Sequence, residues 1–344
     1  MFYTIIVFIL SSIYIYNIYI NTYDRIVFKK VQYLYSAIAQ KAKQIKKIRS
    51  FTNTEILDIT NDTHDQETTD FFHHVYSYYG EKFVITTKHN PNNTKHCIYI
   101  PGNNDYFYNY EMANNLFKNG YNFYAISFPN FGFSSDIKNK NYSTFYSIPR
   151  LFKFIDFILL KYKFKNIDLL MGHSTGALIS IAYASENKNV LKLVLSSPLL
   201  DFYLTKNLKR IFHYLIAPIG IFLPKLNFKS NVGEVNLTTA VEYNREQFNP
   251  RHKSLFEIPT YAQWLYACSR IMLRIHQRNI RLTCPVIIFC SDSSTNTLTE
   301  EADNVIDVSD IVLHAPWLSN HVRIIHIEKS IHSVFIGVDI VKYL

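Results

Sequence analysis

The chain has 344 residues, of which 48% are hydrophobic and 16% aromatic, and this composition excludes a disordered or low-complexity protein. The formal net charge of +9 at pH 7 would indicate a nucleic acid or a membrane as partner if it were spread over the whole chain. Residues 1–50, however, carry +7 of this charge, so the other 294 residues are close to neutral. We therefore expect no nucleic-acid partner, and the overall charge says little about a substrate.

The N-terminal residues 1–20 form an apolar run that only four polar residues interrupt. As a helix, about 20 residues span the hydrocarbon thickness of a bilayer. No Lys or Arg precedes the run and no A-x-A site follows it, so the pattern favours an uncleaved membrane anchor over residues 1–22 rather than a signal peptide. The basic residues that follow predict a catalytic body on the cytoplasmic side. Secretion after signal cleavage, or association with a virion of a large DNA virus, are the alternatives.

Residues 23–70 are expected to form a stem and a linker. Apolar residues recur at helical spacing over 31–49 while lysines occupy the other face, which is the pattern of a basic amphipathic helix on anionic lipid. An ordinary packed helix with a solvated face fits the same pattern. Residues 52–70 are rich in Thr, Asn and Asp and predict a linker. The folded domain is therefore expected over 71–344.

From about residue 75, short apolar runs alternate with helical patterns, and this predicts an α/β fold with a mostly parallel sheet covered by helices on both faces. The stretch 201–281 interrupts the alternation with four prolines and ends in a helical run from Trp264 to Ile275. We expect it to cap the carboxyl edge of the sheet, where open α/β sheets bind ligands. Strands are expected over 83–87, 96–100, 122–127, 167–171, 191–196, 286–290 and 322–327, and helices over 108–118, 149–162, 177–185 and 302–315.

The most informative motif is Gly172-His173-Ser174-Thr175-Gly176, which lies between a predicted strand and a predicted helix. This is the context that the nucleophile-elbow motif G-x-S-x-G requires. A serine at a strained turn presents its hydroxyl clear of the sheet, and the two glycines let strand and helix pass close together. Because only 9 residues are glycine, a chance match is expected in roughly 2 of 100 such chains. We interpret Ser174 as a nucleophile; the alternative is a turn whose serine caps the helix.

A serine nucleophile needs a histidine base and a carboxylate that orients the histidine. In this architecture they follow the serine in the order Asp/Glu, then His, each in a loop beyond a strand. His332 follows the last predicted strand and is the predicted base. Asp303, in the loop after strand 286–290, is the predicted acid, with Asp292 and Asp307 as alternatives.

The oxyanion that forms during acyl transfer needs two backbone N–H donors. Thr175, directly after the nucleophile, is expected to supply one. The loop after strand 96–100 is expected to supply the other, and within it we assign the donor to Asn103, because Gly102 allows the backbone to turn sharply.

Together these pieces resemble the α/β-hydrolase superfamily, and within it the monoacylglycerol lipase, lysophospholipase and serine aminopeptidase-like group. The resemblance covers about residues 80–344 and includes the elbow, Asp303 and His332. It also rests on Ile98-Tyr99-Ile100-Pro101-Gly102-Asn103-Asn104-Asp105-Tyr106 and on the stretches 119–125 and 131–134. The resemblance implies hydrolysis of carboxylic esters, often of acyl glycerols or lysophospholipids, without a cofactor.

The sequence departs from the group's pattern at two places. The usual His-Gly before the oxyanion loop is Pro101-Gly102 here. In the usual D-x-x-G-x-G-x-S stretch, Ser127 stands for the Asp and Asn130 for the first glycine. Neither change removes a predicted triad residue, but both fall in loops that shape the site.

No P-loop, G-x-G-x-x-G or H-E-x-x-H pattern occurs, so we expect no metal and no nucleotide cofactor. The four cysteines (Cys97, Cys268, Cys284 and Cys290) form no C-x-x-C pair and are expected to be reduced core residues.

The leading hypothesis is a membrane-tethered serine hydrolase of lipid or other long-chain acyl esters, with cap aromatics (Tyr261, Trp264 and Tyr266) near the substrate. One alternative is an aminopeptidase or amidase of the same fold, whose pocket for the substrate amine would come from cap glutamates (Glu234, Glu242, Glu246 and Glu257). Another is a catalytically inactive, membrane-bound binding protein that keeps the fold.

Overall fold

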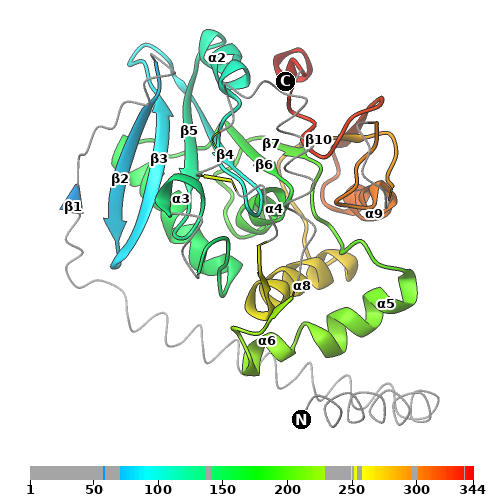
Figure 1. Ribbon diagram of the computed structural model, residues 1–344. Coiled ribbons are helices and arrows are strands. Elements are labelled where there is room, and N and C mark those ends of the chain that lie inside the picture. The colour runs from blue at the N-terminus through cyan, green and yellow to red at the C-terminus, as the bar shows by residue number, and fades with distance from the viewer. Residues whose placement is uncertain are drawn as a thin grey trace, which may run out of the picture. The chain divides into compact units, whose positions relative to one another are not determined.

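The structure is a computed structural model that describes residues 57–58, 70–135, 141–228, 249, 252–253, 258–295, 301–336 and 338–344 (Figure 1). These residues belong to one compact unit, Ile56–Leu344. The predicted anchor over 1–22 lies outside the described residues, and so do the predicted stem and all but three residues of the linker over 23–70.

The predicted membrane localisation is corrected. In the part of the chain that the structure describes, no helix is both long and apolar enough to cross a bilayer. A helix that crosses a bilayer requires about 20 predominantly apolar residues in one continuous helix. The anchor, and with it the placement of the catalytic domain on the cytoplasmic side of a membrane, is therefore not retained.

Nine strands of the described chain form one sheet (Figure 1). They are β1 (Leu57–Asp58), β2 (Phe72–Tyr78), β3 (Glu81–Lys88), β4 (Lys95–Ile100), β5 (Tyr121–Ser127), β6 (Leu169–His173), β7 (Leu193–Ser196), β10 (Val286–Ser291) and β11 (Val322–Ile327). Their order is β1-β2-β3-β5-β4-β6-β7-β10-β11. From β5 to β11 every pair is parallel, whereas β1, β2 and β3 extend the sheet through antiparallel pairs. The predicted mostly parallel sheet is confirmed.

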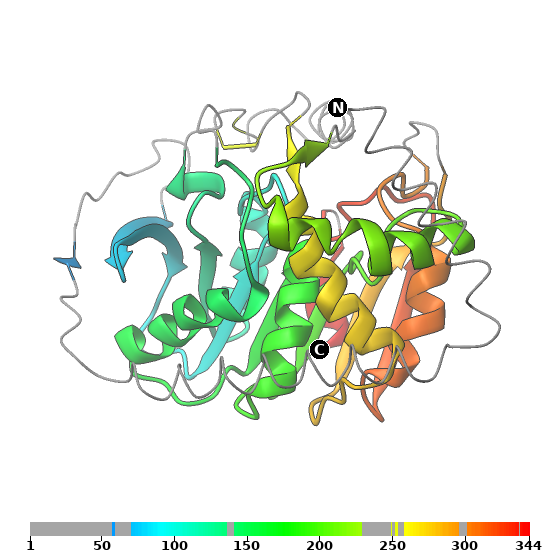
Figure 2. The same cartoon turned by 90° about the horizontal axis from the view of Figure 1, so that it is seen from below.

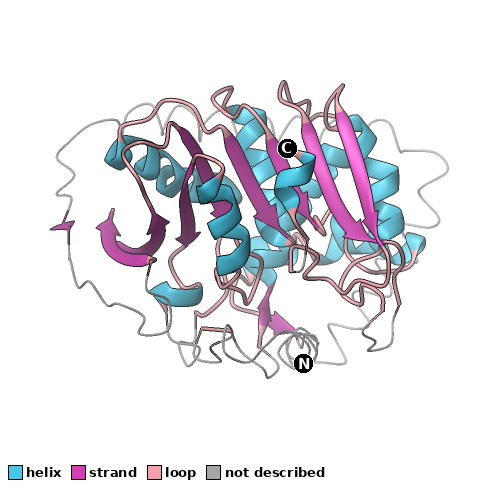
Figure 3. Cartoon of the chain, turned by 90° about the horizontal axis from the view of Figure 1, so that it is seen from above, coloured by secondary structure: helices cyan, strands magenta, loops and turns pink. Residues whose placement is uncertain are grey.

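Helices cover both faces of this sheet (Figure 3). They are α2 (Tyr110–Lys118), α3 (Ile148–Tyr162), α4 (Thr175–Glu186), α8 (Ala262–His276), α9 (Val308–His314) and the 3-10 helix η5 (Ile340–Tyr343). Ile98 and Leu170 pack with α3, α4, α8 and α9 in one apolar core, while their neighbours Cys97 and Leu169 pack with α2 and η5 in another. Alternate residues of β4 and β6 thus point to opposite buried faces, which explains the uninterrupted apolar runs over residues 97–100 and 169–171.

The segment between β7 and β10 contains several short elements before α8 (Figure 2). They are α5 (Lys206–Ile211), the π-helix η2 (Phe212–Ile216), α6 (Ile219–Phe222), β8 (Asn227–Phe228) and β9 (Thr260–Tyr261). α6 packs against α8, because Gly220 leaves room for the backbone of Ala262: an added Cβ would lie 2.2 Å from the Ala262 carbonyl oxygen. α8 continues into the main core through Cys268, Met272 and Ile275. We refer to residues 201–281 as the insertion.

Two of the differences between the observed and the expected elements concern β2 and α9. β2 was not expected, and it pairs with β3 along its whole length. The helix expected over 302–315 begins only at Val308, since the Asp303 carboxylate accepts hydrogen bonds from the N–H groups of Val305 and Ile306. Asp307 then caps α9 by accepting from the N–H of Ser309. All four cysteines are buried and unpaired, as predicted.

The turn from β6 into α4 brings backbone segments into close contact. Ser174, between the two elements, has a φ of +53°, a left-handed conformation that non-glycine residues rarely adopt. A Cβ on Gly176 would lie 2.2 Å from the carbonyl oxygen of Ile100, at the end of β4, and a Cβ on Gly172 would lie 2.6 Å from the Cα of Ala177. Both positions therefore require glycine.

This geometry predicts a large loss of stability for Gly176→Ala. The added methyl group clashes with backbone rather than with a movable side chain, so we expect a loss of about 3 kcal/mol or more in the free energy of unfolding. Gly120→Ala is the matched control, because a Cβ there meets nothing within 4 Å and only the positive φ of +86° is strained, at about 1 kcal/mol. Denaturant unfolding measures both; equal losses would contradict the close approach at the elbow.

Candidate active site

Ser174 is held at the end of β6 by backbone contacts on both sides. Its N–H donates to the carbonyl oxygen of Ser196 in β7 over 2.9 Å. Its own carbonyl oxygen accepts from the N–H of Ala177 at 3.0 Å and from the N–H of Leu199 at 3.2 Å. The strained residue is thus anchored both to the sheet and to the first turn of α4, so its position is set by the rigid part of the fold.

His332 and Asp303 form a buried hydrogen-bonded pair. Nδ1 of His332 lies 2.8 Å from Oδ2 of Asp303, where it donates to the carboxylate. Asp303 is fully buried, and its other oxygen accepts from the N–H groups of Val305 and Ile306 at 2.9 Å and 3.1 Å. Both carboxylate oxygens are therefore satisfied, as burial of a charge requires. With the proton on Nδ1, Nε2 of His332 is left as an acceptor.

The two alternative acids lie elsewhere. Asp292 is exposed, and its carboxylate accepts from the hydroxyls of Ser291 and Ser293. Asp307 caps α9. Within the described residues, the carboxylate that hydrogen-bonds His332 is that of Asp303.

A cavity of about 440 Å³ lies at the elbow, and the predicted residues Ser174, His332, Asn103 and Thr175 all line it. Most of the remaining wall is apolar and comes largely from the insertion: Leu199, Phe202, Leu204, Phe212, Phe228, Trp264 and Leu265. Trp264 is the member of the three predicted cap aromatics that lines the described cavity. The four glutamates expected in an amine pocket (Glu234, Glu242, Glu246 and Glu257) lie outside the described residues.

Other segments hold the loop of Asn103 from two sides. The hydroxyl of Ser143 accepts from the N–H of Asn104 at 2.5 Å and donates to the side-chain oxygen of Asn103 at 2.6 Å. Asp105 forms an ion pair with Lys253 of the insertion, with Oδ1 and Nζ 3.0 Å apart. Asn104 and Ser143 both have positive φ, so the contact joins two strained turns.

Sequence reasoning missed His173, the second residue of the elbow motif. Its ring centroid lies 4.8 Å from that of His332, and its Nδ1 lies 3.3 Å from the Ser196 hydroxyl. Burial, and then the charges of His332 and Lys253, lower the pKa of His173 well below its usual value. His173 is therefore neutral at pH 7 and supports the His332 ring by packing. The motif carries no signal for this role, because any residue fits that position.

Comparison with known proteins identifies the fold of the chain. Residues 97–217 match the family model of the alpha/beta hydrolase fold. The chain has the α/β-hydrolase fold. The predicted fold class, and the resemblance to this superfamily, are thus confirmed. No curated protein matches the chain significantly.

Solved structures with the same fold include two lipases. The chain is similar to a monoacylglycerol lipase of Paleococcus ferrophilus, with 18% identity and a TM-score of 0.58 over 74% of this chain and 91% of that one. A soluble variant of the monoglyceride lipase of Saccharomyces cerevisiae has 15% identity and a TM-score of 0.58 over 80% and 91% of the two chains. The thioesterase domain from the curacin biosynthetic pathway has 14% identity and a TM-score of 0.50 over 79% and 97%. Identities this low establish the fold, and an activity must be argued from the site.

The backbone conformation explains why Asn130 can replace a glycine of the family pattern. Asn130 replaces the usual first glycine after β5 and adopts a φ of +71°. Asn occupies this left-handed region more readily than most residues. Gly132 keeps its glycine, and a Cβ there would lie 2.6 Å from the Cβ of Tyr106. The turn shape therefore survives the replacement.

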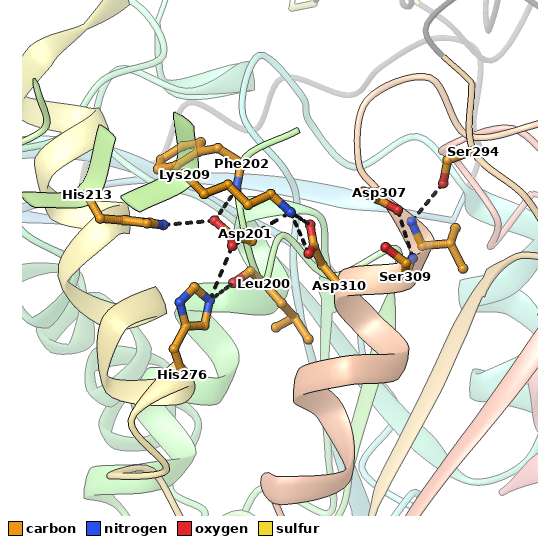
Figure 4. Close-up of polar contacts among 11 residues, drawn as sticks. Leu200, Asp201, Phe202, Lys209, His213, His276, Ser294, Asp307, Ser309 and Asp310 are labelled. Carbon is orange, nitrogen blue, oxygen red and sulfur yellow. Dashed lines mark hydrogen bonds and ion pairs between the residues drawn. The ribbon is translucent and has the colours of Figure 1, made fainter. Parts of the chain in front are cut away.

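A second cluster of buried polar side chains is built around Asp201, next to Phe202 of the cavity wall (Figure 4). Oδ1 of Asp201 lies 2.8 Å from Nε2 of His213, whose Nδ1 lies 2.7 Å from the hydroxyl of Ser269. Burial acts to raise the pKa of Asp201, but the hydrogen bond from His213 and the nearby positive charges hold it below its usual value. The hydrogen bonds of the buried Asp201 carboxylate thus hold this part of the insertion in place.

Lys209 of α5 completes the cluster (Figure 4). Its Nζ donates to both carboxylate oxygens of Asp310 in α9, at 2.5 Å and 2.6 Å, and lies 3.8 Å from Asp201. Two sets of side chains place possible metal-ligating atoms within 4.8 Å of one another: Asp201, His213 and His276, and Asp201, Asp310 and His314. The Lys209 ammonium already supplies these carboxylates with a positive charge. The cluster could not be predicted from the sequence, because its members come from five separate segments.

The burial of His314, which lies beside this cluster, leads us to predict that the stability of the protein depends on pH. Its ring stacks on that of His276 with centroids 4.0 Å apart, and burial, then His276, lower the pKa of His314 to about 4. Because the folded pKa lies below the unfolded value, stability is lost as pH falls from about 6.5 towards 4. We expect His314→Phe, which keeps the ring contact, to remove about 1–2 kcal/mol of the loss between pH 7 and pH 5.

Urea unfolding at pH 7, 6 and 5 measures this difference. His321→Phe, at an exposed histidine, is the matched control and should leave the pH dependence as in the wild type. Parallel curves for the wild type and His314→Phe would contradict the prediction.

Proposed function

We propose that the chain is a serine hydrolase that cleaves carboxylic esters. Ser174 is the nucleophile, His332 the general base and then the general acid, and Asp303 the carboxylate that orients His332. The observation that carries the proposal is the 2.8 Å contact between His332 and Asp303 at a cavity that Ser174 and His332 both line. A histidine with Nδ1 bound to a buried carboxylate has its other nitrogen available for a serine proton.

The reaction then proceeds in two halves. Nε2 of His332 accepts the proton of Ser174 as its Oγ forms a bond to the ester carbonyl carbon. Collapse of the tetrahedral intermediate breaks the bond to the alcohol oxygen, which leaves with the proton from His332, and the acyl group stays on Ser174. A water molecule, which gives its proton to His332, attacks the acyl group, and the acid leaves as Ser174 takes the proton back.

The negative charge of the tetrahedral intermediate is assigned to two backbone N–H groups, those of Asn103 and Thr175. Thr175 is the first residue of α4, so its N–H is not used within the helix and the positive end of the helix dipole adds to its effect. Donors held in place before the reaction stabilise the transition state without further reorganisation. The close contact between Gly176 and the end of β4 supports this assignment, since it brings the two donor-bearing loops together.

The cavity wall favours a neutral substrate with a long acyl chain. Among the described lining residues, Asp105 is the one carboxylate and it is paired with Lys253, which leaves it unsuited to an amine. Phe228 lines the cavity and is also 37% exposed, so the apolar wall reaches the surface. Further apolar side chains of the insertion are exposed next to it in sequence, among them Phe222, Leu223 and Leu226. Apolar contact of this extent stabilises a chain of methylene groups.

The triad is tested by labelling with a fluorophosphonate probe, which forms a covalent bond with an activated serine. The wild type should react, and Ser174→Ala should not. Asp303→Asn should lower kcat for a p-nitrophenyl ester by roughly 10⁴-fold, because the His332 tautomer is no longer held. Asp292→Asn is the matched control and should leave kcat unchanged. Labelling that persists in Ser174→Ala, or equal effects of the two Asn variants, would overturn the assignment.

The substrate class is tested with p-nitrophenyl esters of increasing acyl length. Each buried methylene group contributes about 0.8 kcal/mol, so kcat/KM should rise by up to roughly 10³-fold from acetyl to octanoyl, the value for burial of all six added methylene groups. A preference for acetyl over the longer acyl groups would contradict the long-chain proposal and leave the triad assignment in place.

A further inference from the structure

The ion pair between Lys253 and Asp105 is buried beside the predicted oxyanion donor. The exposed fractions of the two residues are 3% and 4%. Nζ of Lys253 lies 3.0 Å from Oδ1 of Asp105 and donates to the hydroxyl of Tyr108 at 3.1 Å. Tyr108 also accepts a hydrogen bond from Ser333, the neighbour of His332. One ammonium group therefore contacts the loop after β4 and, through Tyr108, the loop that carries His332.

The chain around Lys253 makes further contacts, one with the loop after β4 and one with the segment that carries Ser143. The N–H of Asn249 donates to the hydroxyl of Tyr106 at 2.6 Å. The carbonyl oxygen of His252 accepts from the hydroxyl of Tyr142 at 2.8 Å. The insertion thus reaches across the cavity to the loop after β4, and Lys253 is its charged contact there.

Stability alone does not explain a buried ion pair at this position. The attraction between two buried charges is largely offset by the loss of their hydration, and apolar residues of similar volume often give an equal or higher stability. A close charged pair does, however, fix the relative positions of the segments that carry it, because separation would leave both charges buried without a partner.

We propose that Lys253 is a positioning residue for the oxyanion hole: through Asp105 it fixes the loop that carries the N–H of Asn103. The inference rests on the proposed function, because it gives Lys253 a part in placing that donor. Asp105 lies two residues after Asn103, and Ser143 holds Asn103 and Asn104 from the other side. The loop is therefore held on both sides of the donor.

Small displacements of such a donor have large effects. A shift of about 1 Å in a catalytic group can cost 10²-fold in rate, and loss of one oxyanion donor costs about 10²–10³-fold. The constraint also persists across the working pH range. Burial acts to lower the pKa of Lys253, but the charge of Asp105, the Tyr108 hydroxyl and the hydrogen bonds to both groups together outweigh burial and raise this pKa, so the ammonium stays charged.

The test compares Lys253→Met, the neutral double variant Asp105→Asn/Lys253→Met and the control Lys225→Met, at an exposed lysine of the insertion. Five quantities are measured for each: kcat and KM for a p-nitrophenyl ester, the rate and final extent of fluorophosphonate labelling, and the thermal midpoint. Lys253→Met should lower kcat by roughly 10- to 100-fold, with KM changed by less than about threefold. Labelling should become slower by a similar factor but still reach completion.

The double variant separates positioning from stability. It leaves no unpaired buried charge, so the thermal midpoint should return close to the wild-type value, while kcat stays low. If Lys253→Met does not fold, the same measurements on the double variant still test the inference. Recovery of kcat together with the midpoint, or wild-type kcat in Lys253→Met, would overturn the inference. A wild-type chain that neither hydrolyses esters nor reacts with the probe would instead overturn the proposed function itself.

Discussion

The structure depends on the close approach of α4 to the ends of β4 and β6. At Gly176 the helix comes so near the carbonyl oxygens of Ile100 and Pro101 that no side chain fits between them. This contact places Ser174, in its left-handed conformation, next to the loop that follows β4. It also brings the first N–H groups of α4 to the mouth of the cavity, and the chemistry we propose follows from that one contact.

The elements nearest this contact were predictable from the sequence for a local reason. Each of the central strands is buried on both faces and therefore contains a run of consecutive apolar residues, and both glycines of the elbow are needed within a window of five residues. Such signals lie within a short window. The strand β2, which lies next to the edge strand β1, has no such run, because only His73 and Tyr76 are buried in it, and it was missed.

Contacts between residues distant in the sequence were harder to predict from it. The order Ser, Asp, His pointed to Asp303 and His332, but three acids competed and only the fold brings one of them to the imidazole. The same loop explains the missed helix boundary: the Asp303 carboxylate binds the N–H groups that a helix would otherwise leave at its first turn. His173 and the Asp201 cluster had no signal at all, since their partners are set by packing rather than by spacing.

The insertion is joined to the sheet domain by one buried and one partly buried ion pair, and in both pairs the insertion supplies the lysine. Lys209 and Lys253 come from the insertion, while Asp310 and Asp105 come from α9 and the loop after β4. One pair includes Lys209 of α5 and the other lies beside the loop of Asn103. Lining residues of the cavity belong to the segments that both pairs hold. Apolar packing would tolerate sliding between such segments, whereas a charged pair loses its compensation as soon as its atoms separate. The apolar wall of the cavity and the loop of Asn103 are therefore held in one fixed relation, which a reaction that needs both substrate and donor in register requires.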